Sequence, residues 1–211
     1  VQTGTVSVVP SAGNSVPSGL IVFSYSSGGV TVSEAGVPLL GVGRAFRLAA
    51  EVAGPLNTGE TGVAIANPAE NPVDVGFELF DIAGRSAGLL GKGRIPAKGQ
   101  IALFVGQVDG FQKLQPPFSG TLRVSTQSAS GISLVGLRGR TNERGDFLIT
   151  TTIPIDEANK PSASGLIFPH LADGGGYTTQ FVLLNVIPGQ EAEGTIRYYT
   201  QAGQPLTLTV R

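Results

Sequence analysis

Hydrophobic and polar residues alternate in short segments along most of the chain. Residues 5–8 are Thr-Val-Ser-Val and residues 121–124 are Thr-Leu-Arg-Val, so apolar side chains recur at every second position. This period places the apolar side chains on one face of a β-strand. Residues 147–153 form a β-branched run between Gly145 and Pro154. The pattern predicts many short strands with one buried face, as in a β-sandwich or a barrel.

One segment departs from this alternation. Residues 100–111 carry apolar side chains at helical spacing, through Ile101, Phe104, Val105 and Val108. We expect the end of a strand followed by a short helix or a 3₁₀ turn here. Glycine-containing turn signals separate the other runs, for example at residues 26–29, 83–84 and 202–203. The sequence therefore predicts an all-β fold.

The N-terminal segment matches the second half of the central segment at a shift of 116 positions. Residues 4–8 align with residues 120–124 without a gap. The turn residues also coincide, because the same shift carries Gly29 to Gly145 and Pro38 to Pro154. Glycine and proline mark turns with particular backbone requirements, so a shared pattern of both indicates shared turns.

The C-terminal segment matches the first half of the central segment. Residues 77–84 align with residues 196–203 at a shift of 119, and residues 62–67 align with residues 180–185 at a shift of 118. We therefore predict immunoglobulin-like β-sandwich repeats, one complete and one composite of two halves. Their bounds are 1–40 for the N-terminal half-repeat, 41–155 for the complete central sandwich and 161–211 for the C-terminal half-repeat, with a polar linker near 156–164.

Composition narrows the setting of the protein. The chain of 211 residues has no Cys, Met or Trp, which excludes disulfides, thiolate chemistry and sulfur-ligated metals. Its net charge is −1, so nothing in its charge points to a nucleic-acid partner. No apolar run reaches the roughly 18 residues that would span a bilayer. The missing initiator methionine predicts a removed N-terminal piece, most simply a secretory signal, and hence an extracellular or cell-surface location.

The residues that could carry chemistry are few. His170 is the single histidine and lies between apolar residues, where a packed or capping role is usual. Residues 173–176, Asp-Gly-Gly-Gly, lack the alternating acids of a calcium loop. Residues 144–146, Arg-Gly-Asp, match the integrin-binding tripeptide, but Gly and Asp are also ordinary turn residues. We therefore predict no catalytic residue, no metal and no cofactor, and no enzymatic activity.

Three segments carry a resemblance to known proteins. Residues 136–152, 168–181 and 203–208 resemble the C-terminal region of large secreted proteins from soil bacteria of the acidobacterial type. The resemblance covers essentially the whole chain. It implies an extracytoplasmic setting and a natural C-terminus close to Arg211, and it carries no known activity or functional residue.

The two half-repeats suggest a function in assembly. A half-sandwich leaves an apolar face and unpaired strand edges in water, so we expect the C-terminal half of one subunit to accept the N-terminal half of the next by strand addition. Head-to-tail contact of this kind produces an extracellular filament or surface fibre. The expected interface residues are Thr5, Val6, Val8, Val9, Ile196, Tyr198, Leu206 and Leu208.

Two alternatives stay open at this stage. If the ends of the central sandwich lie at the same pole, the halves can close within one chain, whereas opposite poles require a polymer. A second function is a secreted carbohydrate- or ligand-binding module, with polysaccharide or matrix as its partner. An exposed aromatic row of Tyr177, Tyr198 and Tyr199 would favour that function.

Overall fold

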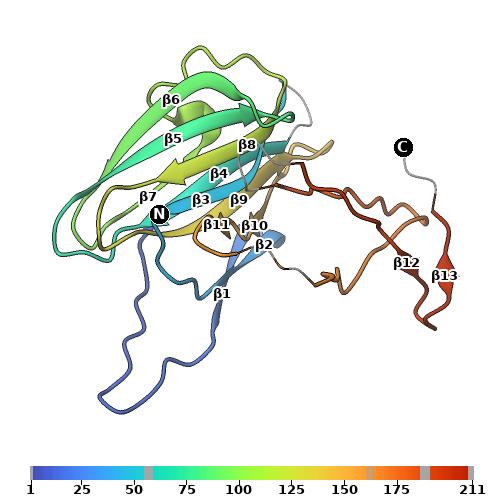
Figure 1. The fold of residues 1–211 in the computed structure, drawn as a ribbon, viewed down its shortest axis with the longest axis horizontal. Coiled ribbons are helices and arrows are strands. Elements are labelled where there is room, and N and C mark those ends of the chain that lie inside the picture. The colour runs from blue at the N-terminus through green and yellow to red at the C-terminus, as the bar shows by residue number, and fades with distance from the viewer. Residues whose placement is uncertain (1, 55–58, 161, 163, 186–190, 209–211) are drawn as a thin grey trace.

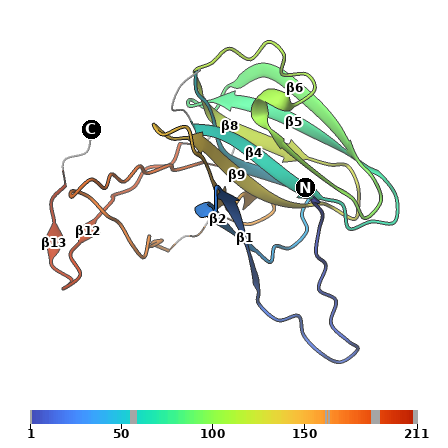
Figure 2. The ribbon, with the colours of Figure 1, turned by 180° about the vertical axis from the view of Figure 1, so that it is seen from behind.

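The protein is described by a computed structural model that covers residues 2–54, 59–160, 162, 164–185 and 191–208 (Figure 1). A central antiparallel β-sandwich occupies the middle of the chain. A hairpin from the N-terminal segment lies against it, and a C-terminal arm extends away from it (Figures 1 and 2). Apart from one 3₁₀ turn, the regular elements of the described residues are all strands, as the alternating pattern predicted.

The sandwich consists of nine antiparallel strands that are connected by continuous hydrogen-bonded pairing. Along the ladder the order is β10-β9-β4-β3-β8-β5-β6, with β7 added on β4 and β11 added on β3. The strands are β3 (Ala45–Val52), β4 (Gly59–Ala66), β5 (Val73–Asp81), β6 (Ser86–Ile95), β7 (Gln100–Phe104), β8 (Phe118–Ser125), β9 (Ser133–Thr141), β10 (Phe147–Thr152) and β11 (Ile155–Asp156).

The core of the sandwich follows from the period-2 pattern. In β5 the buried residues are Val73, Val75, Phe77 and Leu79, and the residues between them are partly or fully exposed. The same alternation in β3, β4 and β8 directs a second set of apolar side chains into the same cluster. Burial of these side chains in one layer is the main stabilising contribution to the sandwich.

The segment with helical spacing forms the predicted combination of elements. Strand β7 ends at Phe104 and continues directly into a 3₁₀ turn, η1 (Val105–Gln107). Val105, Val108 and Phe111 are all buried in the main core. The apolar spacing therefore arises because one turn and the loop after it close an end of the sandwich.

Outside the sandwich the chain contains two further hairpins. Near the N-terminus, β1 (Leu20–Ser27) pairs with β2 (Val30–Pro38). On the C-terminal arm, β12 (Tyr198–Tyr199) pairs with β13 (Pro205–Leu206). The prediction of a strand at residues 5–8 is wrong for this structure, because residues 2–19 contain no strand. A single strand has no ladder partner, and period-2 alternation alone does not supply one.

The chain enters and leaves the sandwich at the same end. Strand β11 pairs with the first residues of β3, in the register Ile155 with Arg47 and Asp156 with Phe46. One residue further on, the Glu157 backbone N–H donates to the Ala45 carbonyl oxygen at 2.9 Å. The N-terminal and C-terminal segments therefore both leave from one pole of the central sandwich. In the described part of the chain, no helix is long and apolar enough to cross a membrane.

Candidate assembly interface

Strand β8 shows what the central sandwich needs in order to be complete. It lies between β3 and β5 and is antiparallel to both. Leu122 of β8 faces Leu48 of β3 on one side and Leu79 of β5 on the other, and at most 2 % of each of these residues is exposed. Strands β3 and β5 therefore border a slot that β8 fills.

The slot is bordered by the hairpin that joins β5 to β6. At its tip the Asp81 N–H donates to the Arg85 carbonyl oxygen at 2.9 Å, and the Gly84 N–H donates to the Asp81 carbonyl oxygen at 2.9 Å. The Asp81 carboxylate accepts the Arg85 N–H at 2.9 Å. This hydrogen bond, with the side chain of Arg85, holds the pKa of Asp81 below its usual value. Gly84 has φ +75°, the left-handed conformation that favours glycine.

The hairpin on the C-terminal arm repeats this turn at the shift of 119. The Thr200 N–H donates to the Gln204 carbonyl oxygen at 2.8 Å, and the Gly203 N–H donates to the Thr200 carbonyl oxygen at 2.9 Å. The Thr200 hydroxyl accepts the Gln204 N–H at 3.1 Å, as the Asp81 carboxylate does for Arg85. Gly203 has φ +78°. The turns share their hydrogen bonds, so the sequence match extends to local structure.

The strand register next to the two turns also agrees. Phe80 pairs with Ser86 in the central sandwich, and Tyr199 pairs with Pro205 on the arm. Both partners are displaced by the same 119 positions. The arm therefore reproduces the tip of the β5–β6 hairpin, and among the described residues no strand beside it corresponds to β8.

The N-terminal hairpin corresponds in position to the β9–β10 hairpin at the shift of 116. Each turn contains a glycine in the left-handed region, Gly29 at φ +79° and Gly145 at φ +83°. The loops differ in length, because Ser27 pairs with Val30 whereas Thr141 pairs with Phe147. The likeness therefore holds for the strands and the turn glycine and not for the loop as a whole.

The predicted interface residues lie in two separate places. Thr5, Val6, Val8 and Val9 are exposed and belong to no strand. On the arm, Tyr198 and Leu206 are paired across β12 and β13 and are half-buried. Ile196 is exposed and Leu208 is half-buried, both outside the strands. The structure brings Tyr198 and Leu206 together, while the four N-terminal residues stay apart from the arm.

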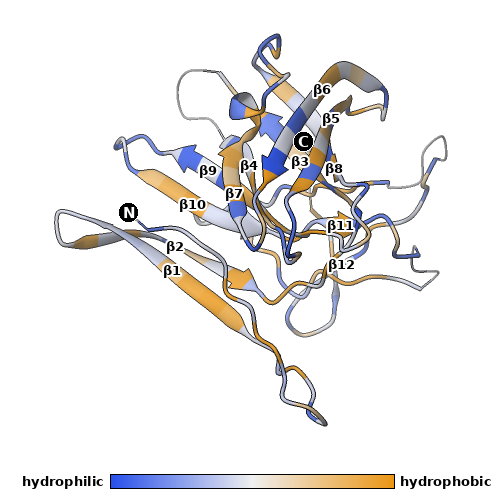
Figure 3. Ribbon diagram, turned by 90° about the vertical axis from the view of Figure 1, so that its left-hand side faces the viewer, coloured by the Kyte–Doolittle hydropathy of each residue, from blue (hydrophilic) through white to orange (hydrophobic). Residues whose placement is uncertain are grey.

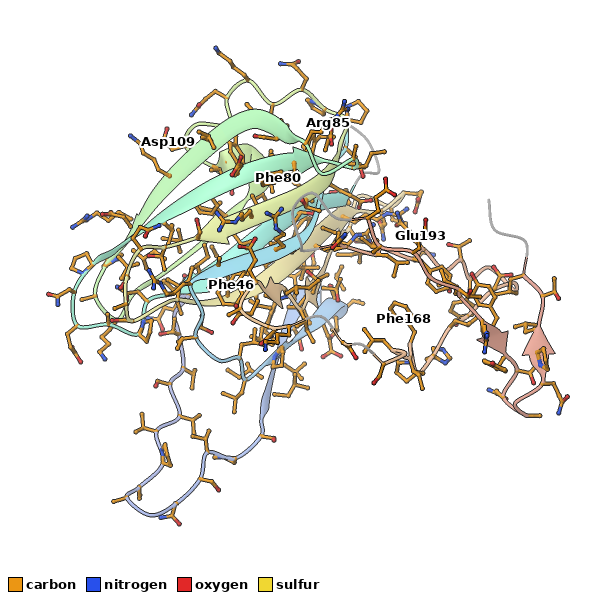
Figure 4. All side chains as sticks on the ribbon, viewed as in Figure 1. Phe46, Phe80, Arg85, Asp109, Phe168 and Glu193 are labelled. Atoms are coloured by element: carbon orange, nitrogen blue, oxygen red, sulfur yellow. The ribbon has the colours of Figure 1, made fainter. Side chains whose placement is uncertain are left out.

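An aromatic cluster on the arm was not expected from the sequence. The rings of Phe168 and Phe181 meet edge to face with centroids 5.8 Å apart, and the ring of Tyr198 lies 5.8 Å from that of Phe181. Figure 4 places Phe168 on the arm, away from the sandwich that contains Phe46 and Phe80. Because Tyr198 packs into this cluster, it does not continue an exposed row with Tyr177 and Tyr199.

Strand β1 presents apolar side chains to solvent. Its residues Leu20, Ile21, Val22 and Phe23 are all exposed. Figure 3 shows β1 as a strongly hydrophobic strand on the outer side of the hairpin. The corresponding strand of the central sandwich, β9, pairs with β4 and has buried residues such as Leu134 and Val135. Strand β1 therefore has the composition of an inner strand but not the environment of one.

The other strand of this hairpin, β2, contacts the free edge of β10. The Ser33 hydroxyl donates to the Ile149 carbonyl oxygen at 2.9 Å and lies 2.8 Å from the Ile149 backbone nitrogen, whose N–H donates to it. The Thr151 hydroxyl donates to the Gly36 carbonyl oxygen. Ala35 is buried at this contact. The sequence reasoning missed it, although Ser33 and Ile149 are themselves 116 positions apart and therefore equivalent in the repeat.

Glu157, Arg47 and Arg123 form a charged cluster at the end of the sandwich where the chain enters and leaves. Glu157 accepts from Arg47 Nε at 2.6 Å, and its two carboxylate oxygens accept from Arg123 Nε and Nη2 at 2.9 Å each. The Arg47 guanidinium also lies 4.5 Å from the centre of the Phe80 ring. Partial burial raises the pKa of Glu157, but the two arginines outweigh this and hold the pKa below its usual value. Glu157 in turn raises the pKa of Arg123.

The other residues that the sequence singled out for possible binding or catalysis lie in turns or on the surface. Asn142 Oδ1 accepts the backbone N–H groups of Arg144 and Asp146, which makes residues 144–146 part of the β9–β10 turn. Gly174 pairs with Tyr177 and closes a tight turn after Asp173. His170 is exposed. Among the described residues, no three carboxylate or imidazole groups gather closely enough to hold a metal ion.

Comparison with known proteins gives one structural neighbour. No family model matches the chain, and no curated protein matches it. Among solved structures, the crystal structure of Thermotoga maritima 1070 is similar over 54 % of this chain and 94 % of that chain, with 8 % sequence identity and a TM-score of 0.43.

Proposed function

We propose that this protein is a structural subunit of an extracellular filament or surface fibre. In this proposal the C-terminal half-repeat of one subunit and the N-terminal half-repeat of the next form a second immunoglobulin-like sandwich by β-strand complementation. No catalytic step is part of the proposal. The observation that carries it is the turn on the arm, which has the hydrogen bonds of the β5–β6 hairpin but, in the part of the chain that the structure describes, no neighbouring strand equivalent to β8.

Exposed apolar residues on both halves support complementation. Val6 is 68 % exposed, and the four apolar side chains at the start of β1 are also exposed. On the arm, Leu166 is 85 % exposed. Full burial of one such side chain contributes about 1.5–3 kcal/mol, so several buried together favour a partner. Backbone hydrogen bonds of an added strand would supply further affinity, and alternate side chains would supply specificity.

The arrangement of the two halves leaves closure within one chain as the alternative to a polymer. Both leave from the same end of the sandwich. In Figures 1 and 2, however, the N-terminal segment and the β12–β13 arm lie on opposite sides of the β1–β2 hairpin. The Ser33 contacts hold that hairpin on β10. This separation favours a partner from another subunit.

Particle size tests the proposal directly. We expect the full chain to form long uniform fibres in negative-stain images, with light scattering that rises above a critical concentration. Deletion of residues 1–9 should abolish the fibres, while far-UV circular dichroism of the sandwich stays unchanged. A matched internal change, Gly41→Ala, should leave fibres intact, because a side chain there meets nothing within 4 Å. A compact 21.6 kDa monomer at all concentrations would refute the filament and point to closure within the chain.

A further inference from the structure

We propose that residues 4–9 of a second copy of this chain enter the C-terminal half in a single register, which Gly4 fixes. This inference rests on the proposed function and names the segment, its neighbours and its alignment. Val6 then lies beside Tyr198, and Val8 lies beside Ile196. The register follows from the way β8 lies in the central sandwich.

The neighbours of Val6 and Val8 follow from the neighbours of β8, because each β8 residue and each partner has a counterpart at the shifts given above. Leu122 corresponds to Val6 at the shift of 116, and Leu79 corresponds to Tyr198 at the shift of 119. In the central sandwich Leu122 is opposite Leu79. Val6 therefore takes the place of a residue that has no exposed surface at all.

The next inward pair gives the same alignment. Val124 of β8 is opposite Phe77 of β5, and both are buried. Their counterparts are Val8 and Ile196. A slip of one residue would turn every side chain of the entering strand to the other face. It would direct Ser7 inward in place of the two valines, and Val6 and Val8 would stay in water.

Gly4 excludes slips of two residues, which would keep the valines inward. Its counterpart Gly120 lies so close to the Phe80 carbonyl oxygen that a Cβ atom at this position would overlap it. The counterpart of Phe80 is Tyr199. A slip by two in either direction would place Gln2 or Val6 against this carbonyl. Glycine at position 4 therefore allows a close backbone approach in only one register.

Gly4 has no such role in the separate chain. A Cβ atom added to it meets nothing within 4 Å, and its φ lies outside the left-handed region. The substitution Gly4→Ala should therefore leave the unassembled protein unchanged. In the assembled state its methyl group would collide with backbone, and we expect the critical concentration for fibres to rise about tenfold or more.

Cysteine pairing tests the register, because the chain contains no native cysteine. A Val8→Cys chain is mixed with an Ile196→Cys chain and oxidised with copper phenanthroline. Directly opposite residues have Cβ atoms about 4.5–5.5 Å apart, whereas partners offset by two are about 7–8 Å apart, too far for a disulfide. We expect a covalent dimer of the mixed chains. The register controls, Val8→Cys mixed with Tyr198→Cys or with Gly194→Cys, should give none.

Each outcome separates the register from the function. If fibres form but a register control cross-links instead, the register is wrong and the filament proposal stands. Unchanged assembly of the Gly4→Ala variant would also overturn the role of Gly4. If the chain carrying both Val8→Cys and Ile196→Cys closes on itself as a monomer and the mixed chains give no dimer, the partner is the same chain. Absence of both fibres and cross-links would refute the proposed function as well.

Discussion

Replacement of Glu157 by glutamine should weaken the central sandwich markedly. Glu157 accepts hydrogen bonds from Arg47 and Arg123 and follows directly after the last strand of the sandwich. Only 9 % of Arg47 is exposed. A glutamine has the same shape and retains one acceptor oxygen, but it carries no charge. The variant therefore leaves a nearly buried guanidinium without its counter-ion.

The expected loss lies between two known limits. Removing one partner of a fully buried ion pair costs about 3–5 kcal/mol, because the other charge stays buried and uncompensated. An exposed pair contributes about 0–1 kcal/mol. The Glu157 side chain is 20 % exposed and that of Arg123 is 32 % exposed, so the cluster is intermediate. We expect Glu157→Gln to lower the free energy of unfolding by about 2–3 kcal/mol at pH 7.

The effect should depend on pH in a defined direction. The two arginines lower the pKa of Glu157 in the folded protein against the opposing effect of its partial burial. A lowered pKa means that the unfolded state binds the proton more readily than the folded state. The stabilisation by Glu157 is therefore complete above the usual glutamate pKa of about 4.3, and it is lost as the pH falls through the lower folded value. The difference between wild type and variant should shrink accordingly.

Urea unfolding followed by far-UV circular dichroism measures both effects. All four tyrosines, at positions 25, 177, 198 and 199, lie outside the sandwich. Tyrosine fluorescence therefore reports on the N-terminal and C-terminal segments and not on the sandwich. Glu143→Gln is the matched control, because Glu143 pairs with Arg140 at an exposed site and its loss should not be measurable. An unfolding free energy unchanged by Glu157→Gln at pH 7, or a loss that stays the same at pH 3, would refute the reasoning.

Three further predictions concern other contacts. Ser33→Ala should release the N-terminal hairpin from β10 and lower the free energy of local opening by about 1–2 kcal/mol. The backbone amide of residue 149 should then exchange faster with solvent, and unchanged exchange would contradict the contact. Asn67→Ala should destabilise the sandwich by about 2–4 kcal/mol in urea unfolding, because its buried amide bonds the carbonyls of residues 71 and 96; a smaller loss argues against this. Val6→Asp should prevent assembly while Ser7→Asp should not, by sedimentation; equal behaviour would refute an inward-facing Val6.

The strands of the sandwich were readable from the sequence because burial itself has the period of the strand. The run from residue 147 forms β10, and the helically spaced segment forms β7 followed by η1. Turn glycines were equally informative, since Gly84 and Gly145 both adopt left-handed backbone that other residues avoid. Local patterns predict structure well where the local requirement is steric.

The parts that sequence reasoning missed depend on partners. Residues 5–8 have the alternation of a strand and yet form none, because a strand exists only when a neighbour accepts its hydrogen bonds. The Ser33 contact is a single hydroxyl on a backbone edge, which leaves no periodic signal. The aromatic cluster on the arm joins Phe168, Phe181 and Tyr198, which are far apart in the sequence and follow no regular spacing. Such features follow from tertiary structure and not from local propensity.

The edges of the central sandwich show how its assembly would stay specific. An open strand edge is a template for unwanted pairing, and natural sheets block it with short strands, charges or covering groups. Here β6 carries Lys92 and Arg94, β11 has two residues, and β10 is covered by the Ser33 hydroxyl. The half-repeats lack this protection, because β1 exposes a run of apolar residues. Under the proposed assembly, pairing between the N-terminal and C-terminal segments would cover this apolar surface.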